Sequence, residues 1–229
     1  MPKSILDDIL VSDKKNLKKG TEDQILKPLL SEINLITDNN VKSFVRSLLL
    51  KAEGFWEIPA SFTGNNHPPD ERGRGGNVLH TKRVVRIAAL LTESYSLSND
   101  EKDVVIAASL LHDLCKGART APDQEYRYDP MHPYAVGRFV AEAQGEDKKF
   151  SSDSESTTIY LQEEIVQSIL RLVRCHLGPW SPVPETFPIT YLDYIVHIAD
   201  NVASKIHQII QDSDLINREW KINGSSAEN

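Results

Sequence analysis

The 229-residue sequence contains only two cysteines and no long hydrophobic run, and both features restrict the class of protein. Cys115 and Cys175 show no paired spacing, which favours reduced thiols in or near the core over a disulfide framework. No apolar run reaches the ~18 residues expected of a transmembrane helix. The first residues lack the order of charged, apolar and small residues that marks a signal peptide. We therefore expect a cytoplasmic protein that does not enter a membrane.

Positive charge is also scarce, because 26 Lys and Arg residues stand against 33 Asp and Glu residues and give a formal net charge of −7. A protein with this balance lacks the broad basic face that usually binds polymeric nucleic acid, although a local positive pocket remains compatible with it. Nucleic acid is therefore a possible but not a favoured partner. A hydrophobic content of 40% in a chain of this length is enough for a sizeable core.

The alternating pattern of β-strands does not occur over any convincing length, whereas apolar residues recur at helical spacing along most of the chain. Residues 56–76 interrupt the helical pattern with a stretch rich in Pro, Gly and Asn, and a loop of that length is usually functional or disordered. Residues 148–158 have the composition of an exposed linker. The sequence thus predicts an all-α fold. We expect residues 1–54 to form an N-terminal helical extension packed on a helical domain over residues 55–215, with residues 216–229 as a tail.

The segment AASLLHDLCKG ends a predicted helix over residues 99–117 and carries a histidine and an aspartate on an otherwise apolar run. Burial of a carboxylate such as Asp113 is costly unless a partner compensates its charge. Further histidines and a second aspartate fall on the apolar faces of other predicted helices. A divalent cation would offset the cost of burying these groups together, because imidazole and carboxylate are its natural ligands. The predicted ligands are His80, His112, Asp113, His132, His176 and Asp200.

At these residues the sequence resembles the HD superfamily of metal-dependent phosphohydrolases, whose signature is H…HD…D. The matching segments are LHTKRVV with His80, LLHDLCKG with His112 and Asp113, and HIADNVASK with Asp200. The resemblance covers roughly residues 55–210 and implies the helical bundle of an HD domain. Members with two metals add two histidines between the HD pair and the last aspartate. The stretch FWEIPASFTGNNHP…GRGGNVLHT is also similar to the lead-in of the HD domains in certain 3′–5′ exoribonucleases.

The resemblance implies a pair of divalent metal ions. His80, His112, Asp113 and Asp200 would hold one ion, and His132 and His176 would hold the other, with Asp113 as the bridge. Two cations about 3.5–4 Å apart can share a hydroxide, lower its pKa and clamp a phosphate for attack. Because imidazole ligands dominate, manganese, iron, zinc, nickel or cobalt are expected before magnesium, which remains possible.

Asp113 and Lys116 are the predicted catalytic residues. The resemblance implies that Lys116 binds phosphate, whereas a lysine at a helix end otherwise compensates the helix dipole. His67 is a predicted substrate contact because of the similar lead-in, and an exposed loop histidine is the alternative. Ser61 is a predicted hydrogen-bond donor to the substrate.

Basic residues gather near the start of the helix that carries His80. Arg83 is a predicted substrate-binding residue, because with its neighbours it would guide a phosphate towards the site; a solvated patch is the alternative. Gly75 and Gly76 would let the loop approach a phosphate closely, or form a plain turn. The basic neighbours are Arg72, Arg74 and Lys82.

Trp180 and Tyr134 could stack on a base or pack in the core, and the core is the favoured interpretation. His197 and His207 share a polar helix face with Asp200, but only Asp200 matches the family. We therefore assign the two histidines to supporting or surface positions.

These observations favour a divalent-metal-dependent phosphohydrolase that hydrolyses a phosphoester or phosphoanhydride of a nucleotide or related small substrate through a metal-bound hydroxide. Residues 1–54 show no sign of the OB domain of exonuclease-type members, and the GYP motif of cyclic di-nucleotide phosphodiesterases is missing. One alternative is a 3′–5′ exonuclease or phosphodiesterase acting on short oligonucleotides. Another is an HD-type mixed-valent diiron oxygenase, which uses a similar set of ligands. A third is a non-catalytic HD domain that senses nucleotides, against which the complete ligand set argues.

Overall fold

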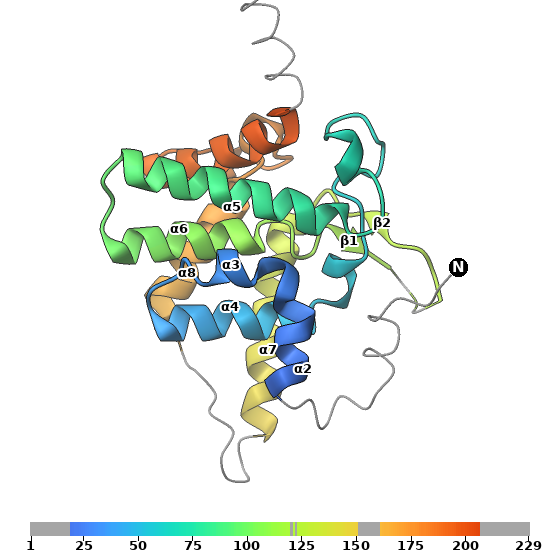
Figure 1. Ribbon diagram of the computed structural model, residues 1–229, viewed down its shortest axis with the longest axis horizontal. Coiled ribbons are helices and arrows are strands. Elements are labelled where there is room, and N and C mark those ends of the chain that lie inside the picture. The colour runs from blue at the N-terminus through green and yellow to red at the C-terminus, as the bar shows by residue number, and fades with distance from the viewer. Residues whose placement is uncertain (1–18, 120, 122, 151–160, 207–229) are drawn as a thin grey trace, which may run out of the picture.

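The computed structural model describes residues 19–119, 121, 123–150 and 161–206, and over these residues the protein is almost entirely helical (Figure 1). The last helical segment covers residues 191–206. The all-α prediction is confirmed. The other helices are α2 (Lys19–Leu26), α3 (Leu30–Ile33), α4 (Asn39–Lys51), α5 (Gly76–Ser94), α6 (Asn99–Leu111), α7 (His132–Phe150) and α8 (Glu163–Cys175).

Short elements connect these helices. The strands β1 (Gly117–Ala118) and β2 (Arg127–Tyr128) form an antiparallel pair in which Gly117 lies opposite Tyr128. The 3-10 turns are η1 (Lys27–Leu29), η2 (Glu53–Trp56), η3 (Pro69–Glu71), η4 (Gly178–Trp180) and η5 (Pro184–Thr186).

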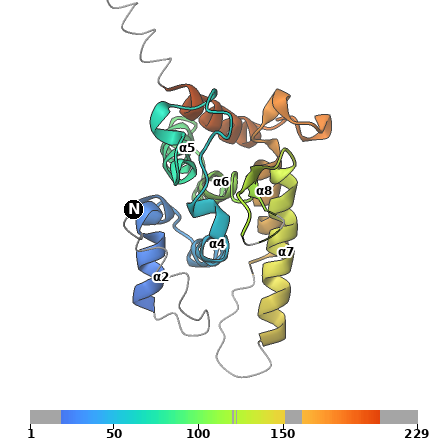
Figure 2. The ribbon, with the colours of Figure 1, turned by 90° about the vertical axis from the view of Figure 1, so that its right-hand side faces the viewer.

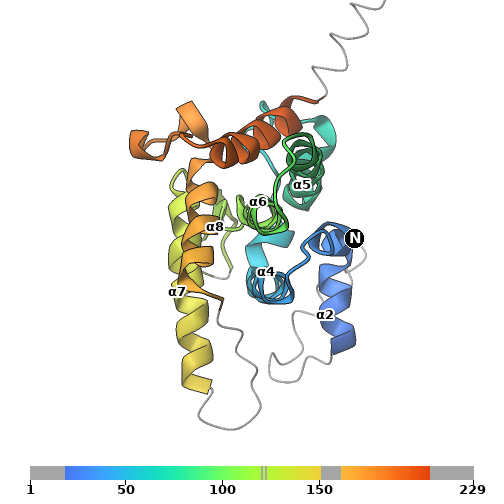
Figure 3. The same cartoon turned by 90° about the vertical axis from the view of Figure 1, so that its left-hand side faces the viewer.

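The central element is α6. All of its residues from Val105 to Leu111 are buried, as expected of a helix that is apolar nearly all round. Helices α3, α4, α5 and α8 pack against it. Figures 2 and 3 show α5 on one side of α6, α4 on the opposite side and α8 beside it. A capping box between Ser98 and Glu101 fixes the start of α6. The other end of the helix lies in the buried interior of the molecule.

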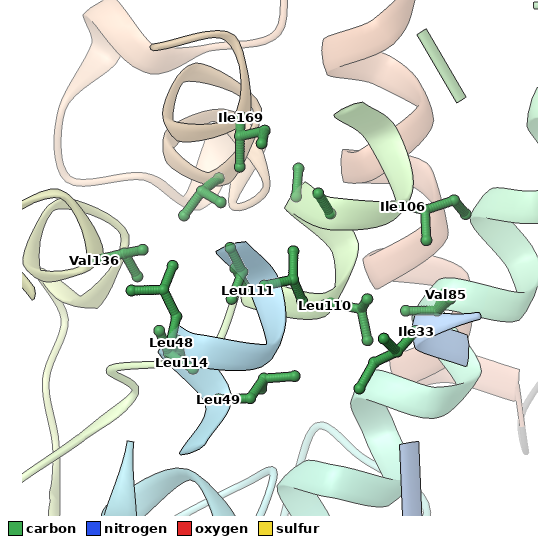
Figure 4. Close-up of a cluster of buried hydrophobic side chains, with 14 of the residues drawn as sticks. Ile33, Leu48, Leu49, Val85, Ile106, Leu110, Leu111, Leu114, Val136 and Ile169 are labelled. Carbon is green, nitrogen blue, oxygen red and sulfur yellow. The ribbon is translucent and has the colours of Figure 1, made fainter. Parts of the chain in front are cut away.

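One hydrophobic cluster joins the N-terminal helices to the rest of the fold. Figure 4 shows Ile33 of α3 and Leu48 and Leu49 of α4 in the same cluster as Leu110 and Leu111 of α6. Burial of each such side chain contributes roughly 1.5–3 kcal/mol. The described part of the predicted N-terminal extension therefore packs firmly on the domain. Residues 1–18 of that extension and the predicted tail lie outside the described residues.

Two predicted helix boundaries were wrong. Helix α6 ends at Leu111 with His112 as its C-cap, instead of continuing to residue 117. The following amides, of Leu114 and Lys116, donate to the carbonyls three residues before them, so the chain turns directly after the HD pair. Helix α7 continues through Phe150, so the predicted linker begins inside a helix, and its residues 151–158 lie outside the described residues.

The described helices include none with both the length and the apolar character needed to cross a bilayer. Cys115 and Cys175 are both free thiols, as expected from their spacing. Burial raises the pKa of Cys115 to about 12 and that of Cys175 to about 11, which keeps both groups protonated and unreactive near neutral pH.

Candidate metal centre

The predicted ligands come together in the interior of the molecule, and three of the histidines lie at helix ends. His112 is the C-cap of α6, His132 is the first residue of α7, and His176 is the C-cap of α8. His80 comes from the first half of α5 and Asp200 from the last helical segment. All four histidines and Asp113 are at most 1% exposed, so their charges and lone pairs are shielded from bulk water.

The ligand atoms form two groups that Asp113 connects. The first comprises His80, His112 and Asp200, and the second comprises Asp113, His132 and His176; within each group the ligand atoms lie within 4.8 Å of one another. Oδ1 of Asp113 is 3.1 Å from Nε2 of His132, and its Oδ2 is 3.4 Å from Nε2 of His112. The structure thus brings together all six predicted ligands, with Asp113 between the groups.

Backbone carbonyls fix the protonation of three of the histidines. Nδ1 of His112, His132 and His176 lies 2.8, 2.7 and 2.6 Å from the carbonyl oxygen of the residue three positions earlier. A carbonyl can only accept a hydrogen bond, so each Nδ1 carries a hydrogen, and in the neutral form of each ring the lone pair lies on Nε2. Carbonyls at helix C-termini lack intrahelical partners, which is why His112 and His176 find them there.

These lone pairs converge without a proton donor between them. Nε2 of His112 and Oδ1 of Asp113 have no hydrogen-bond partner, although both are buried. Nε2 of His132 and Nε2 of His176 face each other at 3.2 Å. Such an arrangement of acceptors is unfavourable by itself and favourable around a cation. The donor set therefore fits a divalent metal.

His80 differs from the other histidines because carboxylates lie at both of its nitrogens. Its Nε2 is 2.9 Å from Oδ1 of Asp200, and its Nδ1 is 3.3 Å from Oε2 of Glu71. Burial would lower the pKa of His80, but these two carboxylates outweigh it and raise the pKa to about 9. Burial and the neighbouring His112 instead lower the pKa of His176 to about 3. A cation bound at the first group would therefore displace a proton from His80.

Glu71 is a buried site residue that the sequence interpretation missed. Its Oε2 accepts a hydrogen bond from Nδ1 of His67 at 2.9 Å, and its Oε1 pairs with the guanidinium of Arg83. Burial would raise the pKa of Glu71, but the hydrogen bonds from His67 and His80 lower it to about 2. His67, Glu71 and His80 are close enough to hold a metal themselves. Because Arg83 already neutralises Glu71, we interpret this carboxylate as the group that orients the two imidazoles. The four-residue spacing of His67 and Glu71 is the sequence signal that points to it.

A cavity of about 420 Å³ opens above the metal centre. Its lining includes Asp113, His132, His176 and Asp200 from the centre, together with three of the predicted catalytic or substrate-binding residues: Ser61, His67 and Lys116. Tyr128 also lines it, and the pairing of β2 with β1 brings this tyrosine beside Lys116; the sequence interpretation missed it.

Lys116 lies at the base of the cavity, 9% exposed, with Nζ 2.5 Å from Oδ2 of Asp113. Burial would lower the pKa of Lys116, but the charges of Asp113 and Asp200 outweigh it and raise the pKa. The same ammonium helps to hold the pKa of Asp113 well below its usual range. The base of the cavity therefore keeps a fixed positive charge beside the ligands.

The loop before α5 forms one wall of this cavity. His67 is 7% exposed, so the alternative of an exposed loop histidine was wrong. Oγ of Ser61 accepts a hydrogen bond from the amide of Gly64 at 3.0 Å, which leaves its hydroxyl hydrogen able to turn towards the cavity.

The predicted basic funnel is not found at the cavity. Arg83 is not among the lining residues, and its guanidinium pairs with Asp70 and Glu71. Nε of Arg72 donates to the carbonyl of His67 at 2.9 Å, so this arginine also supports the loop. The remaining neighbours pair elsewhere: Lys82 with the carbonyl of Pro28, and Arg74 with Glu57.

Gly76 allows the start of α5 to pack closely against the backbone of η3. A Cβ at this position would lie 1.9 Å from the carbonyl oxygen of Glu71, so only glycine lets η3 rest against the start of α5. Gly75 has φ of 76° and forms the N-cap of α5. The structure thus assigns both residues to the turn rather than to a phosphate.

The structure places Trp180, Tyr134 and His197 in three different settings. Trp180 is 68% exposed, so its predicted place in the core was wrong. Tyr134 is half-buried and donates to Oγ1 of Thr186 at 3.2 Å, away from the cavity. Nδ1 of His197 donates to the carbonyl oxygen of His176 at 2.8 Å, which fits a supporting position. His207 lies outside the described residues.

Comparison with protein families matches residues 78–205 to the HD domain. The match covers more than half of the chain and includes all six predicted ligands, and the chain belongs to the HD domain family. Members of this family are generally metal-dependent phosphohydrolases. Comparison with the curated proteins and with the solved structures found no match.

Proposed function

We propose that this protein is a divalent-metal-dependent phosphohydrolase that cleaves a phosphoester or phosphoanhydride bond of a nucleotide or related small phosphorylated substrate. The observation that carries the proposal is the coincidence of two ligand groups, a shared Asp113 and a buried ammonium at the base of one cavity of about 420 Å³. That volume accommodates a small molecule of the size of a nucleotide.

His80, His112, Asp113 and Asp200 would hold one cation, and Asp113, His132 and His176 would hold a second. Bound there, divalent ions supply Lewis acidity for a phosphate oxygen and a lowered pKa for coordinated water. Because imidazole nitrogens dominate the donor set, manganese, iron, zinc, nickel and cobalt are favoured over magnesium.

The other cavity residues would bind and orient the substrate. Lys116 presents a positive charge on a largely buried side chain at the cavity, where it would attract an anionic phosphate oxygen. Nδ1 of His67 is held by Glu71, which fixes the ring and leaves its Nε2 available to a substrate group. Ser61 offers its hydroxyl from the same wall.

The test is turnover of a substrate panel by metal-stripped protein reloaded with manganese. Nucleoside mono-, di- and triphosphates and short oligonucleotides would be incubated with it, and their products separated by chromatography. We expect cleavage of at least one nucleotide, its loss with chelator, and its loss in Asp113→Asn. Asp23→Asn is the matched control, because Asp23 is an exposed carboxylate that pairs with Arg46 and does not line the cavity. Cleavage that persists without metal would contradict the proposal, as would oxygen consumption by iron-loaded protein with no phosphate-bond cleavage.

A further inference from the structure

Trp180 is a large aromatic side chain that lines the cavity and is nevertheless 68% exposed. An indole normally gains stability by burial, so one that stands open at the wall of a cavity is available to a ligand. No other tryptophan of the described residues lines this cavity. Packing within the protein therefore does not explain the position of Trp180.

The turn that carries Trp180 holds the indole in a defined place. Gly178 has φ of 54°, and a Cβ there would lie 2.3 Å from the ring of His197, so the turn η4 rests directly on that imidazole. The amide of Trp180 donates to the carbonyl oxygen of Leu177 at 3.1 Å. The indole itself lies 5.8 Å from the His197 ring, centroid to centroid, at an interplanar angle of 40°.

His197 connects the turn that carries Trp180 to the candidate metal centre. Its Nδ1 donates to the backbone carbonyl oxygen of His176, whose side chain belongs to the second ligand group. Two contacts, of η4 with His197 and of His197 with His176, therefore position Trp180 relative to the candidate metal centre. A ligand anchored at the metal centre would meet the indole at a fixed separation, which favours specific recognition over chance contact.

Polar groups of the last helical segment line the same cavity. Ser204 lies four residues after Asp200, and Lys205 lies four residues after Asn201, so each pair shares a face of the helix. Within the described part of the chain, the side-chain amide of Asn201 and the ammonium of Lys205 make no hydrogen bond or ion pair. A side-chain amide offers both donors and an acceptor, so this side of the cavity suits a ring that itself carries nitrogen and oxygen atoms.

We propose that Trp180 forms a stacking subsite for a heteroaromatic ring, with Asn201 and Lys205 at the edge of that ring and the phosphate of the same molecule at the metal centre. The inference rests on the proposed function and narrows its substrate to the class of nucleotides. Stacking of a base on an aromatic side chain changes affinity by roughly tenfold or more.

The experiment compares two substrates that differ only in the ring. For manganese-loaded wild type and Trp180→Ala, kcat/KM would be measured with adenosine 5′-monophosphate and with ribose 5-phosphate. We expect the ratio of the two values to fall at least tenfold in Trp180→Ala, through KM for the nucleotide, and to be largely restored in Trp180→Phe. Phe187→Ala is the control, because Phe187 is an exposed aromatic residue of the neighbouring loop that does not line the cavity. An unchanged ratio in Trp180→Ala would overturn the subsite and leave the proposed function standing.

Calorimetric titration of the manganese-loaded protein with the same two compounds separates the two proposals when neither compound is turned over. Binding of the nucleotide that weakens tenfold in Trp180→Ala supports the subsite although the proposed function fails. Equal affinity of wild type for the nucleotide and for ribose 5-phosphate, or binding of neither, would overturn the subsite.

Discussion

Nε2 of His132 and Nε2 of His176 face each other at 3.2 Å, and both Nδ1 atoms donate to backbone carbonyls, so neither Nε2 carries a hydrogen when its ring is neutral. Two lone pairs at this distance repel one another. Oδ1 of Asp113 adds a negative charge 3.1 Å from the first nitrogen. The backbone of two helix ends therefore fixes an acceptor pair that only a cation or an additional proton can stabilise.

Replacement of His176 by Gln should remove one of the two bound metals. The second ligand group then loses an imidazole, while His80, His112 and Asp200 keep the first ion. We expect the metal content of purified protein, measured by elemental analysis, to fall from about two ions per chain to about one.

Glu164→Gln is the control for this measurement, because Glu164 is exposed in the first turn of the same helix α8 and belongs to neither ligand group. It should retain about two ions per chain. A wild-type content of one ion per chain, unaffected by His176→Gln, would show that His132 and His176 are not ligands.

Replacement of Lys116 by Met should slow turnover without emptying the centre. Lys116 keeps a charge at the base of the cavity, and loss of one such electrostatic contact typically lowers kcat by about 10²–10³-fold. Metal content should stay at the wild-type level, because bound cations replace Lys116 as partners of Asp113. Steady-state kinetics with the best substrate of the panel, beside elemental analysis, measures both. Lys82→Met is the control, since Nζ of Lys82 bonds the carbonyl of Pro28 outside the cavity; equal kcat in the two variants would exclude a role for Lys116.

The six candidate ligands could be selected from the sequence because each lies on an apolar helical run, where an unpaired polar group has to be explained. Their convergence followed from the same argument, since groups that share one cation must meet. Helix ends were less predictable. The apolar pattern of α6 continues past Leu111, so the pattern alone does not show where the helix ends. The helix ends at Leu111 because tertiary contacts turn His112 and Asp113 towards the centre.

The walls of the cavity could not be predicted in the same way. Glu71 is surrounded in sequence by charged and small residues and is buried only because His67, His80 and Arg83 come together around it. Tyr128 reaches the cavity through a strand pair of two residues on each side, which is too short for an alternating pattern. Arg83 was predicted at the substrate for its charge, but its partners are the acids of the loop.

Replacement of Glu71 by Gln should change how the stability of the metal-free protein depends on pH. The pKa of Glu71 falls from 4.5 to about 2 on folding, so its contribution to stability is complete above pH 4.5 and is lost as the pH falls towards 2. Between pH 6 and 3.5 the wild type should lose on the order of 1.5 kcal/mol more of its free energy of unfolding than Glu71→Gln does.

Urea unfolding of chelator-treated protein at a series of pH values gives this difference. Glu57→Gln is the control, because Glu57 lies near the surface of the same loop and pairs with Arg74. A change in the pH profile that appears in Glu71→Gln and not in Glu57→Gln would be specific to the buried carboxylate. Parallel profiles for Glu71→Gln and wild type would show that the hydrogen bonds to His67 and His80 do not stabilise the carboxylate.

Replacement of Gly76 by Ala should destabilise the protein and disturb the centre, whereas Gly73→Ala should do neither. The new Cβ at position 76 would overlap the backbone of Glu71, at 1.9 Å from its oxygen and 2.4 Å from its carbonyl carbon, and no side-chain rotation can relieve that overlap. We expect a loss of about 3 kcal/mol or more in the free energy of unfolding. A Cβ at position 73 would meet nothing within 4 Å, so its effect should stay within about 0.5 kcal/mol. Because the overlap pushes Glu71 away from His80, Gly76→Ala should also bind manganese more weakly in a calorimetric titration. Equal stability and equal manganese affinity of the two variants would show that the contact between η3 and α5 does not hold the His80 ligand in place.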